Sequence, residues 1–262
     1  MTDEEVLQDT PHRRVVRVGD TVRRPVQAWT PAVHALLSHL EGAGFPFSPR
    51  VLGIDEQGRE VLTYVEGEAG PRSWAKVAGD GGLAAMARLL RDYHDAVAGF
   101  RPPDGLAWYT GETGLGDGKL ICHGDFGPWN VVWRDERPVG ILDWDYARPA
   151  DRLYDIAYAL EHLAPFRDDE ECLRWLAYSR PPDRRHRVKA FAVAYGLPDA
   201  AGLPDAVIGV QRDIRERVRR LGEAGAEPQA TWVADGYLDE LSRRVSWSQE
   251  NRHLFEVDDD TE

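Results

Sequence analysis

Cysteine and methionine are scarce in this chain, which has two of each among its 262 residues. Small secreted scaffolds that depend on disulfides carry many more cysteines than Cys122 and Cys172 provide. One disulfide between these two is open to the chain, but no pattern in the sequence favours it. We therefore expect a reduced, cytoplasmic protein that is held together by its hydrophobic core.

Positive charge is in deficit as well. The chain has 32 lysine and arginine residues against 45 aspartate and glutamate residues, which gives a formal net charge of −13. Proteins that bind nucleic acids usually carry the opposite balance, so we expect no nucleic acid partner. The negative balance would suit a cationic small substrate, although solubility alone explains it equally well.

Long apolar runs are missing too. A helix that crosses a membrane needs about 20 consecutive apolar residues, and no segment approaches that length. The first residues also lack the apolar stretch of a secretory signal. The sequence therefore predicts neither a membrane anchor nor secretion, and it contains no signal for an oligomeric state.

What the chain does have is a short segment rich in oxygen ligands. His123-Gly124-Asp125 and Asn130 precede two apolar runs separated by a polar turn, and Asp143 follows them. This pattern predicts a β-hairpin. A turn centred on Glu136 and Arg137 places Asn130 opposite Asp143, where paired Cβ atoms lie roughly 5 Å apart. Amide and carboxylate oxygens are ligands that Mg²⁺ prefers, so the hairpin predicts a magnesium site.

A glycine-rich segment with a proline, residues 66–71, divides the chain. Before it, residues 1–13 are polar and are expected to be frayed. Thr30 is expected to cap a helix whose apolar residues keep helical spacing. The remaining β-type runs predict strands at Arg14–Val18, Thr21–Arg24, Arg50–Ile54 and Glu60–Val65. Residues 1–66 therefore predict a small β-rich lobe.

Residues 67–262 are mainly helical apart from the hairpin. Their apolar periodicity predicts helices at Leu83–Val97, Leu153–Leu163, Glu170–Tyr178, Arg184–Tyr195, Asp205–Leu221 and Thr231–Trp247. The whole pattern predicts an α+β protein with a small N-terminal lobe and a larger helical C-terminal lobe. A crevice at the hinge between two lobes is a common place for a ligand.

Three motifs, taken together and in order, resemble those of the aminoglycoside phosphotransferase and choline kinase family, small-molecule relatives of the protein kinases. They are His123-Gly124-Asp125 with Asn130, Ile141-Leu142-Asp143-Trp144-Asp145-Tyr146-Ala147, and Asp151 through Asp155-Ile156-Ala157. The resemblance spans roughly residues 14–165. It implies a two-lobed, protein-kinase-like fold. It also implies Mg²⁺-dependent transfer of the γ-phosphate of ATP or GTP to a hydroxyl of a small molecule such as an aminoglycoside, an amino sugar or an aminoalcohol.

The resemblance assigns a role to each residue that matches these motifs. Asp125 would be the catalytic residue that accepts the proton of the substrate hydroxyl. Asn130 and Asp143 would hold Mg²⁺, in agreement with the hairpin argument. His123 and Asp155 would give structural support, His123 by ordering the loop and Asp155 by bracing it or capping a helix.

The nucleotide half of the site matches the family less well. Main-chain groups of Tyr64-Val65-Glu66 would bind the purine, and Arg23, with Arg24 as the alternative, would replace the usual phosphate-binding lysine. Residues 1–18 contain no glycine for a phosphate loop, and no acidic residue lies between positions 21 and 40 to pair with that arginine. Asp145 would bind a substrate ammonium or lie in solvent.

Three other interpretations stay open. A degenerate kinase-like module would bind a ligand without turnover, which the missing glycine loop favours. A metal-dependent hydrolase built on His123, Asp125 and Asp143 would need a denser ligand cluster. A protein kinase is disfavoured because no activation segment is visible. Among residues outside the motifs, Glu161 and His162 are expected to lie on an ordinary helix face.

Overall fold

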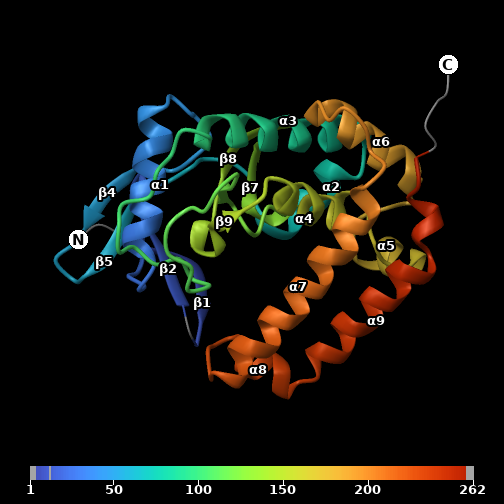
Figure 1. Ribbon diagram of the computed structural model, residues 1–262. Coiled ribbons are helices and arrows are strands. Elements are labelled where there is room, and N and C mark those ends of the chain that lie inside the picture. The colour runs from blue at the N-terminus through green and yellow to red at the C-terminus, as the bar shows by residue number, and fades with distance from the viewer. Residues whose placement is uncertain (1–3, 12, 258–262) are drawn as a thin grey trace. The chain divides into compact units, whose positions relative to one another are not determined.

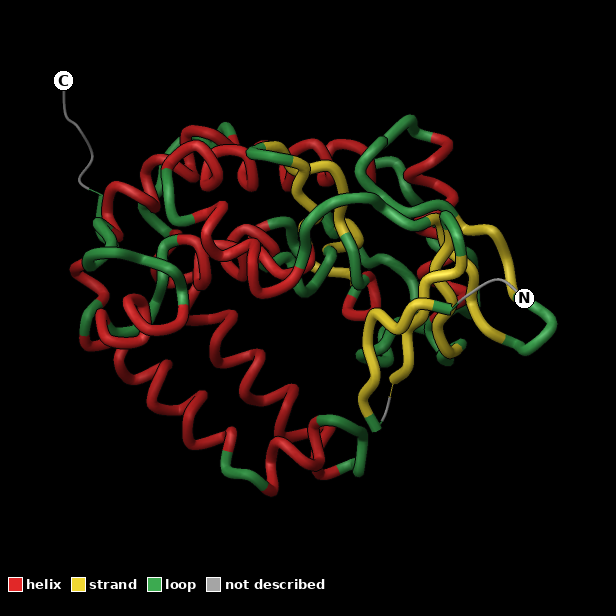
Figure 2. The backbone as a smooth tube through the Cα atoms, turned by 180° about the vertical axis from the view of Figure 1, so that it is seen from behind, coloured by secondary structure: helices red, strands yellow, loops and turns green. Residues whose placement is uncertain are grey.

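The computed structural model describes residues 4–11 and 13–257. Their contacts divide the chain into two compact units, one of Met1–Gly70 with Asp92–Arg152 and one of Pro71–Arg91 with Leu153–Glu262. The strands belong to the first unit and the second is helical, as Figure 1 shows by label and Figure 2 by colour. The predicted α+β class is confirmed. These contact-based units differ from the two lobes predicted at residues 1–66 and 67–262. The division into those lobes stays a prediction.

A five-stranded antiparallel sheet opens the first unit, in the order β1-β2-β3-β5-β4. Its strands are β1 (Glu5–Thr10), β2 (Arg13–Val18), β3 (Thr21–Pro25), β4 (Val51–Ile54) and β5 (Arg59–Thr63). The frayed segment expected before β2 is wrong for β1, which pairs with β2. All residues of β1 are exposed, so no apolar alternation marks it. Residues 1–3 and 12 of that expectation lie outside the described residues.

Helix α1 (Thr30–Gly42) belongs to the same unit, and its apolar positions at helical spacing are all buried. Thr30 is the first helical residue rather than the cap, and its hydroxyl accepts a hydrogen bond from the Gln27 N–H at 2.9 Å. The expected capping role of Thr30 is therefore wrong, because its side chain turns back to the preceding loop. Pro31 occupies the first turn, where its missing N–H is not needed.

Two further strand pairs complete the first unit. β6 (Leu120–Cys122) pairs with β9 (Arg148–Ala150), and β7 (Val131–Arg134) pairs with β8 (Arg137–Ile141). The predicted hairpin is thus confirmed in β7 and β8. Large buried side chains pack around these strands. The Tyr93 hydroxyl donates to the Ile121 carbonyl at 2.6 Å, which ties the end of α3 (Asp80–Val97) to β6.

The register of the β7–β8 hairpin differs from the prediction. Val131 faces Ile141, and the Leu142 N–H donates to the Asn130 carbonyl at 2.7 Å. Asn130 is therefore opposite Leu142, and its predicted direct opposition to Asp143 is wrong. The turn begins one residue earlier than expected, at Asp135, which moves the partner of Trp133 by two residues, to Pro138. The irregularity between Val132 and Trp133 then restores one residue, so that Val132 faces Gly140.

The second unit is built from helices α4 to α9, with the short α2 (Ser73–Val77) and the first part of α3. The larger helices are α4 (Leu153–Leu163), α5 (Asp169–Trp175), α6 (Arg184–Tyr195), α7 (Leu203–Glu223), α8 (Gln229–Ala234) and α9 (Tyr237–Glu250), and 3₁₀ turns lie at Gly70–Arg72 and Arg252–Leu254. The bounds predicted for α4 and α6 are confirmed. α7 packs along α4 and α9, and α8 joins the ends of α7 and α9 (Figure 1).

The single helix predicted at Thr231–Trp247 is wrong. Gly236 separates α8 from α9 and has φ +84, a left-handed conformation that ends the helical path. Apolar spacing continues across this break, so periodicity alone does not reveal it.

Both cysteines are free and buried, Cys122 at the end of β6 and Cys172 in α5. Burial raises the pKa of the Cys172 thiol to about 11, which keeps it protonated near neutral pH. Among the described helices, none combines the length and apolar character that crossing a membrane requires.

Candidate active site

Gly124 sets the path of the loop that carries Asp125. Its φ is +80, in the left-handed region that favours glycine. A Cβ at this position would lie 2.0 Å from the main-chain oxygen of Tyr146. The loop can therefore pass against the segment that follows Asp143 only because residue 124 has no side chain.

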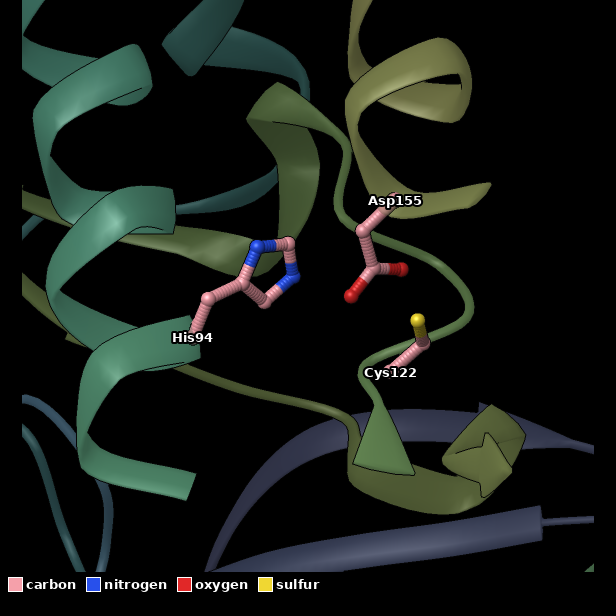
Figure 3. A group of neighbouring side chains, drawn as sticks. All are labelled: His94, Cys122 and Asp155. Atoms are coloured by element: carbon pink, nitrogen blue, oxygen red, sulfur yellow. The ribbon is translucent and has the colours of Figure 1, made fainter. Parts of the chain in front are cut away.

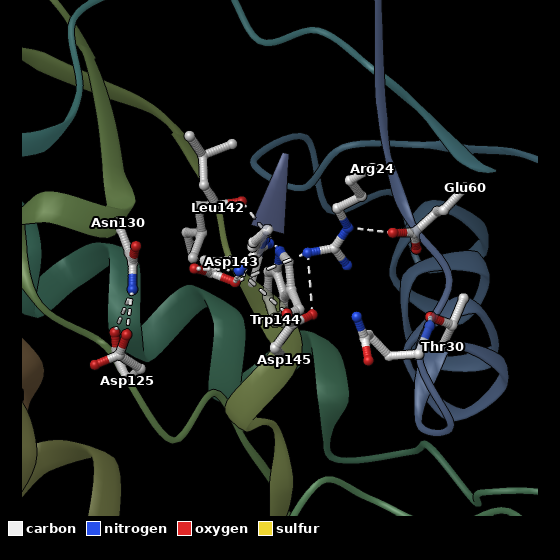
Figure 4. Close-up of polar contacts among 12 residues, drawn as sticks. Arg24, Thr30, Glu60, Asp125, Asn130, Leu142, Asp143, Trp144 and Asp145 are labelled. Atoms are coloured by element: carbon white, nitrogen blue, oxygen red, sulfur yellow. Dashed lines mark hydrogen bonds and ion pairs between the residues drawn. The ribbon is translucent and has the colours of Figure 1, made fainter. Parts of the chain in front are cut away.

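Asp125 and Asn130 are joined by hydrogen bonds on this loop. Asn130 is buried in the 3₁₀ turn Pro128–Asn130, and its Nδ2 donates to Asp125 Oδ2 at 2.7 Å and to the Asp125 carbonyl at 2.9 Å. The Trp129 Nε1 also donates to Asp125 Oδ2, at 3.4 Å. Figure 4 shows the Asn130 Oδ1 pointing away from Asp125. The amide orientation thus fixes one carboxylate oxygen and presents Oδ1 to another partner.

His123 links this loop to the end of the hairpin. Its Nε2 lies 2.9 Å from the Leu142 carbonyl, and its Nδ1 accepts from the Asp125 N–H at 3.3 Å. A neutral ring protonated on Nε2 satisfies both contacts. The Trp144 ring packs edge-on against the imidazole, with centroids 4.7 Å apart. These contacts support the bracing role of His123, which stays a prediction.

Asp143 lies two residues after the end of β8 and has φ +56, so the chain turns sharply there before the 3₁₀ turn Trp144–Tyr146. Its carboxylate faces arginine side chains. Arg13 Nη1 lies 3.2 Å from each Asp143 oxygen, and Arg24 Nη1 lies 3.8 Å from Oδ1. The structure therefore brings Asp125 and Asn130 together and surrounds Asp143 with positive charge.

Asp145 shares both of these arginines. Its Oδ2 lies 3.2 Å from Arg13 Nη1, and its Oδ1 lies 3.0 Å from Arg24 Nη1. Burial, together with the charge of Asp143, raises the pKa of Asp145 although Arg24 opposes the shift. Both oxygens have cationic partners, so this geometry gives no support to the predicted contact of Asp145 with a substrate ammonium.

Arg24 has a buried acidic partner that the sequence argument missed. The Glu60 carboxylate accepts from Arg24 Nε (Figure 4). Its Oε1 lies 2.8 Å from His34 Nε2 of α1. Glu60 is fully buried. Burial alone would raise its pKa, but the hydrogen bond from His34 and the charge of Arg24 outweigh burial and lower it. The partner expected on the helix lies on β5 instead.

The strand register explains why Glu60 was missed. β3 pairs with β5 so that Arg24 faces Glu60 directly. Both strands are visible in the sequence, but their pairing is not, because β4 lies between them along the chain. Opposite charges on directly opposed positions identify such a pair only once the strand pairing is known.

Arg23 points to different partners. Its Nη1 donates to the Thr21 hydroxyl at 2.5 Å, and its Nε lies 3.5 Å from Asp55 Oδ2. Successive side chains of a strand point to opposite faces, so only one of the two adjacent arginines can reach Asp143 and Asp145. The structure brings Arg24, the alternative candidate, to these carboxylates.

The predicted hinge follows β5 at Tyr64-Val65-Glu66. The Tyr64 N–H donates to the Asp20 carbonyl at 2.8 Å, and the Glu66 carbonyl accepts from Arg134 Nη2 at 3.3 Å. Within the described residues, the N–H and C=O of Val65 make no such main-chain bond. Gly140 of β8 gives room for the Val65 side chain, because a Cβ there would lie 2.7 Å from Val65 Cγ1. Purine binding by this segment stays a prediction.

Asp155 is buried in the first turn of α4. Figure 3 shows Asp155 together with His94 and Cys122, which are buried in the other unit. The supporting role of Asp155 stays a prediction.

Similarity to known proteins agrees with these positions. A model of the phosphotransferase enzyme family matches residues 115–191, which include Asp125, Asn130 and Asp143. The trifolitoxin immunity protein of Rhizobium leguminosarum bv. trifolii is 32% identical over 270 residues, covering 98% of this chain and 99% of that protein.

The chain belongs to the phosphotransferase enzyme family.

Solved structures show the fold of this phosphotransferase. The GDP complex of aminoglycoside 2′-phosphotransferase-IIIa has a TM-score of 0.61 at 15% identity and covers 95% of this chain and 93% of that one. A Plasmodium vivax ethanolamine kinase has a TM-score of 0.54 at 11% identity and covers 94% of this chain and 80% of that one. The predicted protein-kinase-like fold is confirmed. The predicted enzyme class, a small-molecule phosphotransferase with an alcohol group as acceptor, is confirmed as well.

Proposed function

We propose that this phosphotransferase uses Mg²⁺ to transfer the γ-phosphate of ATP or GTP to a hydroxyl of a small molecule such as an aminoglycoside, an amino sugar or an aminoalcohol. The observation that carries the proposal is the pairing of Asp125 with Asn130, 2.7 Å apart, on the loop that leads into the hairpin ending at Asp143. Phosphoryl transfer depends mainly on positioning and charge neutralisation, for which a few oxygen groups suffice.

Asp125 is the proposed base. It is half-buried, and its Oδ2 is held by Asn130 Nδ2 and Trp129 Nε1. A carboxylate fixed in this way would accept the hydroxyl proton of the acceptor as the oxygen attacks phosphorus. The same hydrogen bonds would keep the carboxylate from turning away while the acceptor binds.

The donor set suits Mg²⁺. Asn130 Oδ1 and the Asp143 carboxylate are hard oxygen ligands, and Mg²⁺ takes few of these from the protein. The Asp143 side chain is 32% exposed, and Asn130 Oδ1 points away from the base. When bound, Mg²⁺ would neutralise charge on the transferring phosphates.

Nucleotide binding is supported at two places. Val65 offers a main-chain donor and acceptor for a purine edge. Arg24, anchored by Glu60, presents a fixed positive charge beside Asp143 and Asp145. The same fold holds a guanine nucleotide in aminoglycoside 2′-phosphotransferase-IIIa, which was solved as a GDP complex. Arg24 is therefore preferred over Arg23 as the phosphate-binding arginine.

The full-length likeness to the trifolitoxin immunity protein favours immunity to a toxin as the biological role of this chemistry. Phosphorylating a toxin hydroxyl would confer immunity if the product were inactive. A degenerate module would confer immunity by binding the toxin alone. The absence of glycine from residues 1–18 favours the module, and the ordered Asp125–Asn130 pair favours turnover.

The test measures phosphate transfer from labelled ATP and GTP across a panel of alcohols, aminoglycosides and trifolitoxin, for the wild type and for Asp125→Asn and Asp143→Asn. Asp135→Asn is the matched control, because Asp135 is exposed in the turn of the same hairpin. We expect transfer by the wild type and the control, and a loss of at least about a hundredfold in the two site variants.

A toxin-sensitive strain that expresses each variant separates the two roles. Immunity that disappears with Asp125→Asn supports phosphorylation. Immunity that survives in both site variants, with no phosphorylated product, would replace the proposal with the binding module.

A further inference from the structure

The β1–β2 hairpin places a cation on the residue proposed to hold Mg²⁺. Arg13 is the first residue of β2, and its guanidinium contacts both Asp143 oxygens through Nη1 and Oδ1 also through Nη2, each at 3.2 Å. The Arg13 side chain is only 25% exposed. Arg13 Nη1 also lies 3.2 Å from Asp145 Oδ2. The hairpin thus places a positive charge beside the carboxylates of Asp143 and Asp145, although Arg13 is far from both in sequence.

The two arginines of this cluster are held very differently. Arg24 is buried, and its Nε bonds the buried Glu60, which His34 holds in turn. In the part of the chain that the structure describes, Arg13 has no comparable anchor. Among the described residues, its side-chain ion pairs are all with Asp143 and Asp145. Arg24 is therefore a fixed charge, whereas Arg13 depends on Asp143 and Asp145 for its position.

Arg13 and a metal ion compete for the same oxygens. Mg²⁺ binds carboxylate oxygens at about 2.0–2.1 Å and demands near-ideal geometry. A guanidinium in contact with both Asp143 oxygens has to move before the ion can enter that geometry. A triphosphate at the site would offer the displaced guanidinium a new bidentate partner. Metal entry therefore costs less when phosphate is present.

We propose that Arg13 couples metal binding to nucleotide binding: it holds Asp143 in the nucleotide-free enzyme and turns onto the phosphates of the nucleotide when the metal takes Asp143. Arg13 thereby supplies the phosphate contact for which residues 1–18 provide no glycine loop. This inference rests on the proposed function only in assuming that a nucleoside triphosphate binds. Because coupling is reciprocal, nucleotide must raise metal affinity by the same factor as metal raises nucleotide affinity.

The test compares the wild type with Arg13→Gln, Arg13→Lys and Arg14→Gln. Arg14 is the matched control, since it follows Arg13 on β2 but is 59% exposed and pairs with Asp9 at 3.7 Å. Mn²⁺ affinity is measured by electron paramagnetic resonance with and without nucleotide. ATP and GTP affinities are measured by calorimetry with and without Mg²⁺. Circular dichroism confirms that each variant is folded.

We expect Arg13→Gln to bind Mn²⁺ alone about tenfold more tightly and the metal–nucleotide pair about tenfold more weakly, which removes most of the coupling. Arg13→Lys should restore part of it, because lysine keeps the charge without the bidentate fork. Arg14→Gln should behave as the wild type.

Two results would overturn the inference. One is an Arg13→Gln protein whose metal and nucleotide affinities match those of Arg14→Gln. The other is tighter Mn²⁺ binding with unchanged nucleotide affinity, which makes Arg13 a simple blocker. Coupling that is lost in Arg13→Gln, in an enzyme that phosphorylates no acceptor, would reject the proposed function and leave this inference standing.

Discussion

At the scale of single residues, the position of Asp125 depends on a neighbour that has no side chain. Gly124→Ala would place a Cβ 2.0 Å from the Tyr146 carbonyl oxygen in a left-handed conformation. The strain and the clash together should lower the free energy of unfolding by about 3 kcal/mol. Denaturant titration measures this change, and phosphate transfer should fall with it because the loop has to move.

Gly118→Ala separates the two causes. Gly118 also has a positive φ, +69, but no atom lies within 4 Å of a Cβ built there. Its substitution should cost only about 1 kcal/mol. Equal costs at the two positions would mean that the approach of Tyr146 does not constrain the loop.

Single residues also mark where sequence reasoning stops. Asp125, Asn130 and Asp143 form a motif whose spacing is local, so they could be found without a structure. Glu60 could not, because its relation to Arg24 depends on which strands pair. Arg13 lies one residue before the strand predicted at Arg14–Val18, and its approach to Asp143 depends on a hairpin whose residues in β1 are all exposed.

At the scale of elements, α4 buries a polar face that was expected to be ordinary. Glu161 and His162 are 2% and 9% exposed, and Arg167 Nη2 donates to His162 Nδ1 at 3.2 Å. Periodicity locates α4 but cannot say that α7 covers this face. Burial, helped by the charges of Arg167 and Arg244, lowers the pKa of His162 well below its ordinary value.

This shift predicts a stability loss on acidification. In the unfolded chain His162 takes up a proton below about pH 6.5, whereas the folded protein resists protonation until the pH is much lower. The free energy of unfolding should therefore fall as pH drops from 6.5 towards 5, by up to about 1.4 kcal/mol per pH unit from this group. Above pH 7 the contribution should be constant.

His162→Gln isolates the effect, because glutamine can still accept from Arg167 but does not titrate. Denaturant titration from pH 5 to 8 measures the free energy of unfolding of both proteins. As the pH falls, this free energy should decrease less in the variant than in the wild type. His253→Gln is the control, since His253 is exposed. If the free energy of unfolding depended on pH in the same way in the wild type and in His162→Gln, this histidine would not be the source of the stability loss in acid.

The β7–β8 hairpin shows a second limit of prediction from sequence. The sequence predicts that β7 and β8 pair, and they do, but the turn and the irregularity after Val132 place Leu142 opposite Asn130. A shift of one residue reverses which side chains share a face. Apolar patterns fix the existence of strands more reliably than their register, because turn geometry decides the register.

At the scale of the whole molecule, the net charge of −13 gives the proposed cationic acceptors a testable signature. A negative protein attracts a cation over a distance that shrinks from about 30 Å at 0.01 M salt to about 10 Å at 0.1 M. With nucleotide and Mg²⁺ saturating, kcat/KM for an aminoalcohol should fall roughly tenfold as NaCl rises from about 0.01 to about 0.3 M.

The matched acceptor is the uncharged alcohol of the same size, whose kcat/KM should change much less because it carries no charge to be steered. Steady-state kinetics at constant nucleotide and Mg²⁺ give both slopes from one enzyme preparation. Equal salt dependence for the two acceptors would mean that the acidic surface does not act on the acceptor. The acceptor class would then have to be sought among neutral alcohols, with the negative charge serving solubility alone.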